Sequence, residues 1–133
     1  MSVMVAHVMT SKVVFAAPGH TVDHVRELMA SKRIHALPVA DMNSKLLGIV
    51  TSGDVARRID GAREVREVMN DTVCIVRATD PVSEAAVRMR ENRVHHLVVT
   101  DNGRAVGIVS AFDLLSVVAN AAKKAPEARP PNT

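Results

Sequence analysis

Aromatic side chains are almost absent from this chain of 133 residues, which has two phenylalanines, Phe15 and Phe112, and no tryptophan or tyrosine. Platforms that bind single-stranded nucleic acid or RNA need aromatic rings on which bases stack. This class of function is therefore not expected, and neither is a carbohydrate-stacking site. Apolar residues make up 47% of the chain, so the core must consist mainly of Val, Leu, Ile and Met.

Cysteine is equally scarce, with Cys74 as its single example. One cysteine can form neither an intramolecular disulfide nor a zinc-type cysteine pair, and it fits a reducing compartment as a small buried apolar residue. The first nine residues are mostly apolar, but they lack a basic start, and His7 followed by Ser11-Lys12 makes the stretch too short for a signal peptide or membrane span. We expect a cytoplasmic protein that makes no membrane contact.

The net charge is also small, because the chain has 17 Lys and Arg residues and 14 Asp and Glu residues. Residues 123–133 hold Lys123, Lys124 and Arg129 against one acidic residue, so the rest of the chain is nearly neutral. Three basic residues without a recognition motif give little support to nucleic-acid binding through this tail, and we do not expect a nucleic-acid partner.

The chain does contain an internal repeat. A shift of 60 positions, reduced to 59 after one deletion in a turn-forming stretch, aligns fourteen identical residues in a single order. In the longest match, Gly48-Ile49-Val50-Thr51-x-x-Asp54 corresponds to Gly107-Ile108-Val109-Ser110-x-x-Asp113. We assign residues 4–62 to repeat 1, residues 63–120 to repeat 2, and residues 121–133 to a flexible, basic, proline-rich tail.

Each repeat has the pattern β-α-β-β-α. A β-rich run at 13–15 or 73–76 precedes a helix whose apolar residues have helical spacing, from Val22 to Met29 or from Val82 to Met89. Two strands follow, at 36–39 with 46–50 and at 96–99 with 105–109, and helices at 53–59 and 112–119 close the repeats.

Local signals support these boundaries. Asn102-Gly103 predicts a type I′ hairpin turn, because that turn needs positive φ at both central residues. Thr21 and Asp80-Pro81 predict helix caps. Since about 50 residues cannot cover their own sheet, we expect an α/β (α+β) fold in which two repeats pack sheet to sheet about a pseudo-twofold axis.

The repeated unit resembles the CBS domain, named after cystathionine beta-synthase, and two copies resemble a Bateman module. The resemblance covers roughly residues 4–120 and rests on the Gly-containing segments together with Ile34-His35-Ala36-Leu37-Pro38-Val39 and Val94-His95-His96-Leu97-Val98-Val99. It implies a stand-alone, non-catalytic regulatory protein. Such a protein binds an adenosine-containing ligand in the cleft between repeats, forms a disc-shaped homodimer and signals to a partner protein that the sequence does not identify.

The residues themselves are suited to such a ligand. Thr51 and Ser110 stand where a strand passes into a helix, whose N-terminal N–H groups favour phosphate. Asp54 and Asp113, three residues later, can accept hydrogen bonds from ribose hydroxyls. Both Thr/Ser-x-x-Asp patterns also fit a capping box that needs no ligand, and the two roles can coexist.

Basic residues before the middle strands are the candidates for further phosphate contacts. In nucleotide-sensing members of the family the matching stretch reads Val-His followed by a basic residue, and this pair contacts phosphate. The resemblance thus implies that His35, His95 and His96 contact phosphate, with Arg33 and Arg93 adding charge. A metal site at these histidines lacks a carboxylate or cysteine at ligand spacing, so no metal is expected.

The adenine base is expected between the first strand and the Gly-containing strand of one repeat. Its candidate contacts are equally suited to an ordinary core: Val13, Val14, Val73, Cys74, Ile34, Ile49, Val94 and Ile108. In repeat 1, Ala36 occupies the position that His96 has in repeat 2, and Gly53 occupies the position of Phe112. The two sites are therefore expected to be unequal.

We therefore expect a protein without catalytic activity that binds AMP, ADP or ATP as a regulatory ligand. S-adenosylmethionine or NAD is an alternative ligand. A different class of function also remains open, namely a dimerising interaction module whose ligand sites are vestigial.

Overall fold

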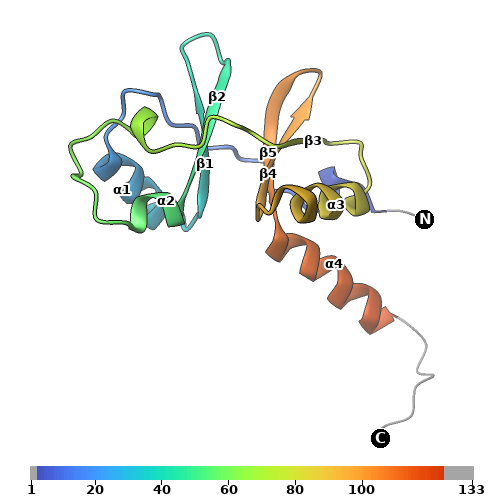
Figure 1. Cartoon of the computed structure of the whole chain (residues 1–133). Helices are drawn as coiled ribbons and strands as arrows, with labels where there is room; N and C mark the ends of the chain where they lie inside the picture. Colours follow the sequence, from blue (N-terminus) through green and yellow to red (C-terminus); the bar gives the residue numbers. More distant parts are fainter. Residues whose placement is uncertain (1–2, 125–133) are drawn as a thin grey trace, which may run out of the picture.

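The computed structural model describes residues 3–124 and contains the two predicted repeats side by side (Figure 1). The predicted tail from residue 125 onward lies outside the described residues. The elements of repeat 1 are the 3-10 helix η1 (Val5–His7), α1 (Val22–Lys32), β1 (Ala36–Ala40), β2 (Leu46–Thr51) and α2 (Ser52–Ala56). Those of repeat 2 are η2 (Val65–Glu67), β3 (Ile75–Arg77), α3 (Val82–Asn92), β4 (His96–Asp101), β5 (Arg104–Ser110) and α4 (Ala111–Lys124).

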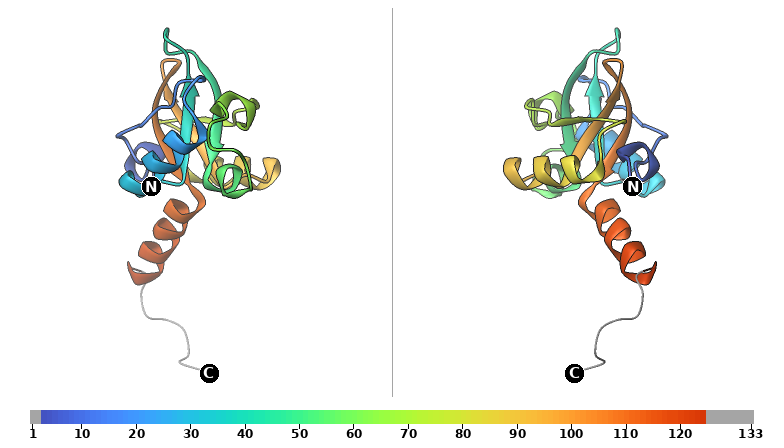
Figure 2. Two further views of the ribbon diagram at one scale, coloured as in Figure 1. Left: turned by 90° about the vertical axis from the view of Figure 1, so that its left-hand side faces the viewer. Right: turned by 90° about the vertical axis from the view of Figure 1, so that its right-hand side faces the viewer.

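The two sheets face each other in the middle of the molecule, with α1 and α2 on one outer side and α3 on the other, while α4 projects away from both repeats (Figures 1 and 2). A small apolar cluster from both repeats, centred on Ala36, Ile49 and Val98, lies between the sheets. Separate cores under the helices contain the fully buried Leu37 in repeat 1 and Leu97 in repeat 2. The predicted packing of sheet against sheet is confirmed.

Helix ends follow the predictions in part. The hydroxyl of Thr21 accepts a hydrogen bond from the amide of His24 at 3.1 Å, as expected for a cap. The prediction for Asp80 is wrong, because Pro81 is the N-cap of α3 and the Asp80 carboxylate instead accepts the amide of Arg77 at 2.9 Å. Helix α2 ends at Ala56, three residues early, whereas α4 extends to Lys124, so residues 121–124 belong to a helix and not to the tail.

The hairpin between β4 and β5 has the predicted turn, with φ of 52° at Asn102 and 79° at Gly103. In both hairpins the register shifts at the same place, between Val39 and Ala40 and between Val99 and Thr100. A bulge adds local twist to a strand pair, so the two hairpins bend alike despite their loops of different length.

The first strand forms in repeat 2 only. There β3 runs parallel to β4, and the amide of Val98 donates to the carbonyl of Cys74 at 3.1 Å. Repeat 1 has Pro38 at the position of Val98, and proline has no N–H to donate. The predicted strand at 13–15 is therefore wrong, and a single bridge between Ala16 and Val39 takes its place.

The start of each repeat crosses to the other repeat. Residues 3–10 contact repeat 2, where Val5 is buried in the core and Thr10 exchanges backbone hydrogen bonds of 2.8 and 3.0 Å with Ile108. Residues 61–70 contact repeat 1, where Val65 is buried and Asn70 exchanges two bonds of 2.9 Å with Ile49. We call residues 3–10 and 61–70 the crossing segments.

Gly48 and Gly107 permit this crossing. A Cβ atom at Gly107 would lie 2.6 Å from Sδ of Met9 and 2.9 Å from the Thr10 carbonyl oxygen. At Gly48 it would lie 2.6 Å from Sδ of Met69 and 2.8 Å from the carbonyl oxygen of Asn70. The glycine of each Gly-containing motif is thus required by the close approach of a crossing segment.

Candidate functional site

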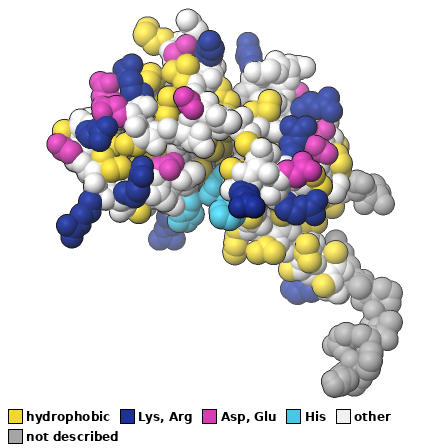
Figure 3. Space-filling model, viewed as in Figure 1, with side chains coloured by type: hydrophobic (Ala, Val, Ile, Leu, Met, Phe, Trp, Pro, Cys, Tyr) yellow, Lys and Arg dark blue, Asp and Glu magenta, His cyan; other side chains and the backbone are white. Residues whose placement is uncertain are grey.

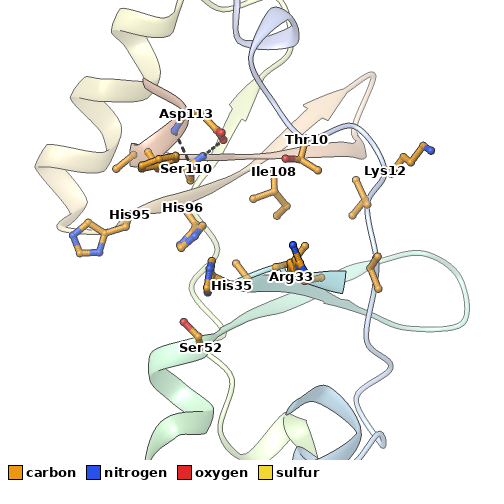
Figure 4. A pocket seen from close by; sticks show the side chains of 16 residues that line it. Thr10, Lys12, Arg33, His35, Ser52, His95, His96, Ile108, Ser110 and Asp113 are labelled. Carbon is orange, nitrogen blue, oxygen red and sulfur yellow. Dashed lines mark hydrogen bonds between the residues drawn. The ribbon is translucent and has the colours of Figure 1, made fainter. Parts of the chain in front are cut away.

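A cavity of about 630 Å³ lies between the two repeats, and we call it the larger cavity (Figure 4). Its walls come from residues 10–14, the stretch 33–36 and the start of α2 in repeat 1, and from the start of β4, the strand β5 and the start of α4 in repeat 2. The lining residues are Thr10, Lys12, Val13, Val14, Arg33, Ile34, His35, Ala36, Ser52, His95, His96, Ile108, Ser110, Ala111, Phe112 and Asp113.

The crossing segments explain why this cavity joins two repeats. The backbone pair of Thr10 with Ile108 holds the stretch that continues to Val13 and Val14 against β5 of repeat 2. The base was expected between two strands of a single repeat, whereas the strand beside Val13 and Val14 in this cavity belongs to the other repeat. No property of an isolated repeat indicates this exchange.

The two ends of the larger cavity differ chemically. Ser110, Asp113, His95 and His96 lie toward one end, and Lys12 lies at the other, with Ile108 between them (Figure 4). One end is therefore rich in hydrogen-bonding side chains. The other end holds the Lys12 side chain together with the backbone and apolar side chains of Val13 and Val14.

Ser110 and Asp113 form a reciprocal cap at the start of α4. The amide of Ser110 donates to Oδ2 of Asp113 at 2.8 Å, and the amide of Asp113 donates to the Ser110 hydroxyl oxygen at 3.1 Å. Within residues 3–124, Oδ1 of Asp113 receives no hydrogen bond. The capping interpretation is thus confirmed, and it leaves one carboxylate oxygen for a ligand.

The histidines come together between the two repeats (Figures 3 and 4). The carbonyl of His95 accepts the amide of Ala111 at 2.8 Å, and the carbonyl of His35 accepts the amide of Ser52 at 2.8 Å. These equivalent bonds tie each histidine backbone to the first residue of a helix. The side chains of His35 and His95 are exposed, whereas His96 is half-buried.

The pKa of His96 is shifted from its ordinary value. Burial lowers its pKa below the ordinary value, and the neighbouring His35 and His95 lower it further, while the Asp113 carboxylate acts in the opposite direction. The neutral imidazole is therefore favoured. An anion placed beside it favours the protonated form, so His96 is suited to respond to phosphate.

Arg33 and Arg93 have unusual backbone geometry. Each ends a helix in the left-handed region, with φ of 54° and 55°, and its amide donates to the carbonyl of Met29 or Met89. Glycine is the usual residue at such a position because it has no Cβ. Arginine at both positions therefore adds backbone strain, and Arg33 places a cation at the larger cavity.

A second cavity, of about 330 Å³, is the counterpart of the first, and we call it the smaller cavity. Thr51 and Asp54 take the places of Ser110 and Asp113, and Cys74 takes the place of Val14. The lining residues are Ile49, Thr51, Ser52, Gly53, Asp54, Asn70, Thr72, Cys74, Arg93, Val94, His95 and His96.

The structure thus brings all but one of the predicted site residues to a cavity. The exception is Val73, which lines neither of these two cavities and packs against the apolar cluster between the sheets. Sequence reasoning missed Thr10, Ser52 and Asn70. Thr10 and Asn70 directly follow the repeated Val-Met pairs, and this spacing is the signal that could have indicated them.

No three His, Cys, Asp or Glu side chains within residues 3–124 are arranged to hold a metal ion. Across the same residues, no helix combines the length and apolar character that crossing a bilayer requires.

Two crossed repeats, each with a helix, a strand hairpin and a closing helix, with a ligand-sized cavity between them define a tandem domain pair. The sequence model of the CBS domain matches residues 5–61 and 65–120. The chain therefore belongs to the CBS domain family.

One similar protein of known sequence is an inosine-5′-monophosphate dehydrogenase of Methanocaldococcus jannaschii. It is 34% identical over 109 residues, which are 81% of this chain and 22% of that protein. The chain spans 21 to 34% of the length of such curated relatives. Their activities belong to proteins that are several times longer.

Two solved structures share the fold. The CBS domain pair of protein MJ0100, in complex with 5′-methylthioadenosine and S-adenosyl-L-methionine, has a TM-score of 0.85 at 24% identity and covers 91% of this chain and 99% of its own. CBSX2 in complex with AMP has a TM-score of 0.75 at 23% identity, covering 90% of this chain and 98% of its own.

Proposed function

We propose that this chain is a regulatory module that binds an adenine nucleotide, AMP, ADP or ATP, between its two repeats and has no catalytic activity. The observation that carries the proposal is the meeting of Asp113, Ser110 and the three histidines at one end of a cavity of about 630 Å³. Ligand cavities for small molecules have volumes of about 300 to 1,000 Å³.

The two ends of the larger cavity match the two ends of a nucleotide. Oδ1 of Asp113 can accept hydrogen bonds from ribose hydroxyls while Oδ2 continues to cap α4. The Ser110 hydroxyl, Arg33 and the imidazoles of His35, His95 and His96 supply donors to phosphate. The base would lie toward Val13 and Val14, against Ile34 and Ile108.

The known complexes support the ligand class. A CBS pair of the same fold was solved with 5′-methylthioadenosine and S-adenosyl-L-methionine, and another was solved with AMP. All three molecules contain adenosine. The phosphate donors around the larger cavity favour a nucleotide for this chain over S-adenosylmethionine, which carries no phosphate.

Isothermal titration tests this proposal with AMP, ADP, ATP, S-adenosylmethionine and NAD as separate probes. We expect at least one adenine nucleotide to bind with a Kd well below about 1 mM, which corresponds to roughly −4 kcal/mol. Failure of every probe to bind below that concentration would overturn the proposal. It would favour the alternative of an interaction module with vestigial sites.

We also propose that a second copy of the chain covers α4 and that the resulting homodimer reports ligand binding to a partner protein. The face of α4 exposes Phe112 by 77%, Leu115 by 62% and Val118 by 65%. Grouped apolar side chains of this kind mark interaction surfaces. Sedimentation equilibrium should find a dimer for the natural chain and a monomer for Leu115→Glu; a monomeric natural chain would contradict the dimer.

The cellular location remains a proposal as well. A cytoplasmic location is supported by the single cysteine and by the adenine nucleotides proposed as ligands.

A further inference from the structure

The two cavities are equivalent by sequence but differ in how far their polar groups are already satisfied. We propose that only the larger cavity binds nucleotide, so that one chain binds one nucleotide and not two. This inference rests on the proposed nucleotide-binding function. It assigns that function to the cavity that contains Asp113 and withholds it from the cavity that contains Asp54.

The first difference is at the end of the cavity proposed for the base. In the smaller cavity the carbonyl of Cys74 accepts the amide of Val98 at 3.1 Å. In the larger cavity the carbonyl of Val14 accepts no hydrogen bond from any residue in the range 3–124, because Pro38 has no amide hydrogen to offer. The Val14 carbonyl thus remains available to accept a hydrogen bond from the exocyclic amino group of a base, whereas the equivalent Cys74 carbonyl is already paired.

The second difference is at the end proposed for phosphate. The Thr51 hydroxyl donates its proton to Oδ2 of Asp54 at 3.0 Å. Both hydroxyls accept the amide of the aspartate three residues later. Within residues 3–124, however, the Ser110 hydroxyl proton has no acceptor of its own, so it remains available to a ligand. Because phosphate oxygens only accept hydrogen bonds, the free donor lies at the larger cavity.

The third difference is in the shared wall. His95, His96 and Ser52 line both cavities, whereas His35 lines the larger cavity only. A phosphate held by His95 and His96 in the larger cavity uses the same donors that a second phosphate would need. The smaller cavity, with about half the volume, retains Arg93 as its separate cation.

Two matched substitutions test the inference. In Asp113→Asn and Asp54→Asn one side-chain oxygen remains as an acceptor for the helix cap. The other oxygen is replaced by an amide NH2, which cannot accept a hydrogen bond from a ribose hydroxyl. Each protein is titrated with AMP, ADP and ATP, and the number of nucleotides bound per chain is measured. Thermal unfolding of each variant shows whether its fold is preserved.

We expect one equivalent of nucleotide per chain in the natural protein. Loss of hydrogen bonds to a charged group should weaken binding by about 30-fold or more in Asp113→Asn, whereas Asp54→Asn should stay within about threefold of the natural chain. A crystal structure grown with AMP should contain AMP beside Asp113 alone.

Two equivalents per chain, or an equal loss of affinity in Asp54→Asn, would overturn the inference and leave the proposed function intact. Absence of binding by all three nucleotides to the natural chain would instead remove the proposed function, and the inference with it.

Discussion

In repeat 2, Val98 donates its amide to Cys74, and β3 forms as a third strand of the sheet. In repeat 1, Pro38 occupies the same place and the sheet stops at two strands. The Thr51 hydroxyl likewise donates to the Asp54 carboxylate, whereas the Ser110 hydroxyl only accepts the amide of Asp113 in the same kind of helix cap. Duplication thus preserved the chain path while single substitutions changed which polar groups remain available to a ligand.

The largest effect we predict concerns a feature that both repeats share. Gly48→Ala and Gly107→Ala each place a Cβ within 3.0 Å of a backbone carbonyl oxygen on a crossing segment. Overpacking of this kind costs about 1 to 3 kcal/mol, and we expect both variants to lose about 3 kcal/mol in the free energy of unfolding, measured by urea denaturation.

Gly53→Ala is the matched control, because the nearest atom to its added Cβ is 3.7 Å away. Its stability should stay within about 0.5 kcal/mol of the natural chain. A tolerated substitution at Gly48 but not at Gly107 would show that one crossing segment moves aside readily, and the structural equivalence of the repeats would fail.

A second prediction concerns Val98→Pro, which gives repeat 2 the residue that repeat 1 has at Pro38. Val98→Pro removes the hydrogen bond to Cys74, and we expect a loss of about 1 to 2 kcal/mol in the free energy of unfolding. Hydrogen exchange should become faster at the amides of β3. Unchanged exchange there would mean that this bond does not hold β3 in place.

The reciprocal variant is Pro38→Val, which supplies the missing donor to Val14. It should slow exchange in the segment around residues 13–16. If this segment already exchanges as slowly as β3 in the natural chain, the difference between the two repeats does not depend on Pro38.

These variants also show where sequence reasoning was limited. The paired hairpins, the helices α1 and α3 and the Asn102-Gly103 turn could be predicted because periodicity and turn chemistry are local. The missing first strand depends on one absent N–H at Pro38, which lies 24 positions after Val14. The exchange of crossing segments depends on packing between repeats, which no local pattern encodes.

The candidate site divides in the same way. Asp54, Asp113, His35 and His95 could be found because they recur at equivalent positions in both copies, and His96 directly follows His95. The assembly of these residues into one larger and one smaller cavity could not be predicted. Each cavity combines residues 10–14 or 70–74 of one repeat with the Gly-containing strand of the other repeat.

A third, smaller effect concerns Arg33 and Arg93 at the ends of α1 and α3, where stability and ligand binding should respond differently. Arg33→Gly and Arg93→Gly relieve a left-handed residue that carries a Cβ, and each should change the free energy of unfolding by less than about 1 kcal/mol, in the stabilising direction. Only Arg33 lines the larger cavity. Titration with ATP should therefore detect weaker binding in Arg33→Gly alone, and equal weakening in both variants would contradict one-sided binding.

The smallest effect we predict is the pH dependence that His96 adds to repeat 2, where repeat 1 has Ala36. The pKa of His96 is lowered in the folded chain, mainly by burial, so below its ordinary value of 6.5 the unfolded chain binds this proton more readily. The stability of the ligand-free protein should therefore fall as the pH drops from about 7.5 to 5.5. The lowered pKa values of Asp80 and Glu67 act below this window, because their ordinary values are 3.8 and 4.5.

His96→Ala restores the residue of repeat 1 and should reduce this loss, as measured by thermal unfolding across the same pH range. Nucleotide affinity should change in the opposite direction, because a phosphate beside His96 favours the protonated imidazole and binding then takes up a proton. In the natural chain the affinity for AMP should therefore rise relative to His96→Ala as the pH falls. Parallel pH profiles for the two proteins would mean that His96 does not face the phosphate, and this would leave Ser110, Arg33, His35 and His95 as the proposed phosphate donors of the larger cavity.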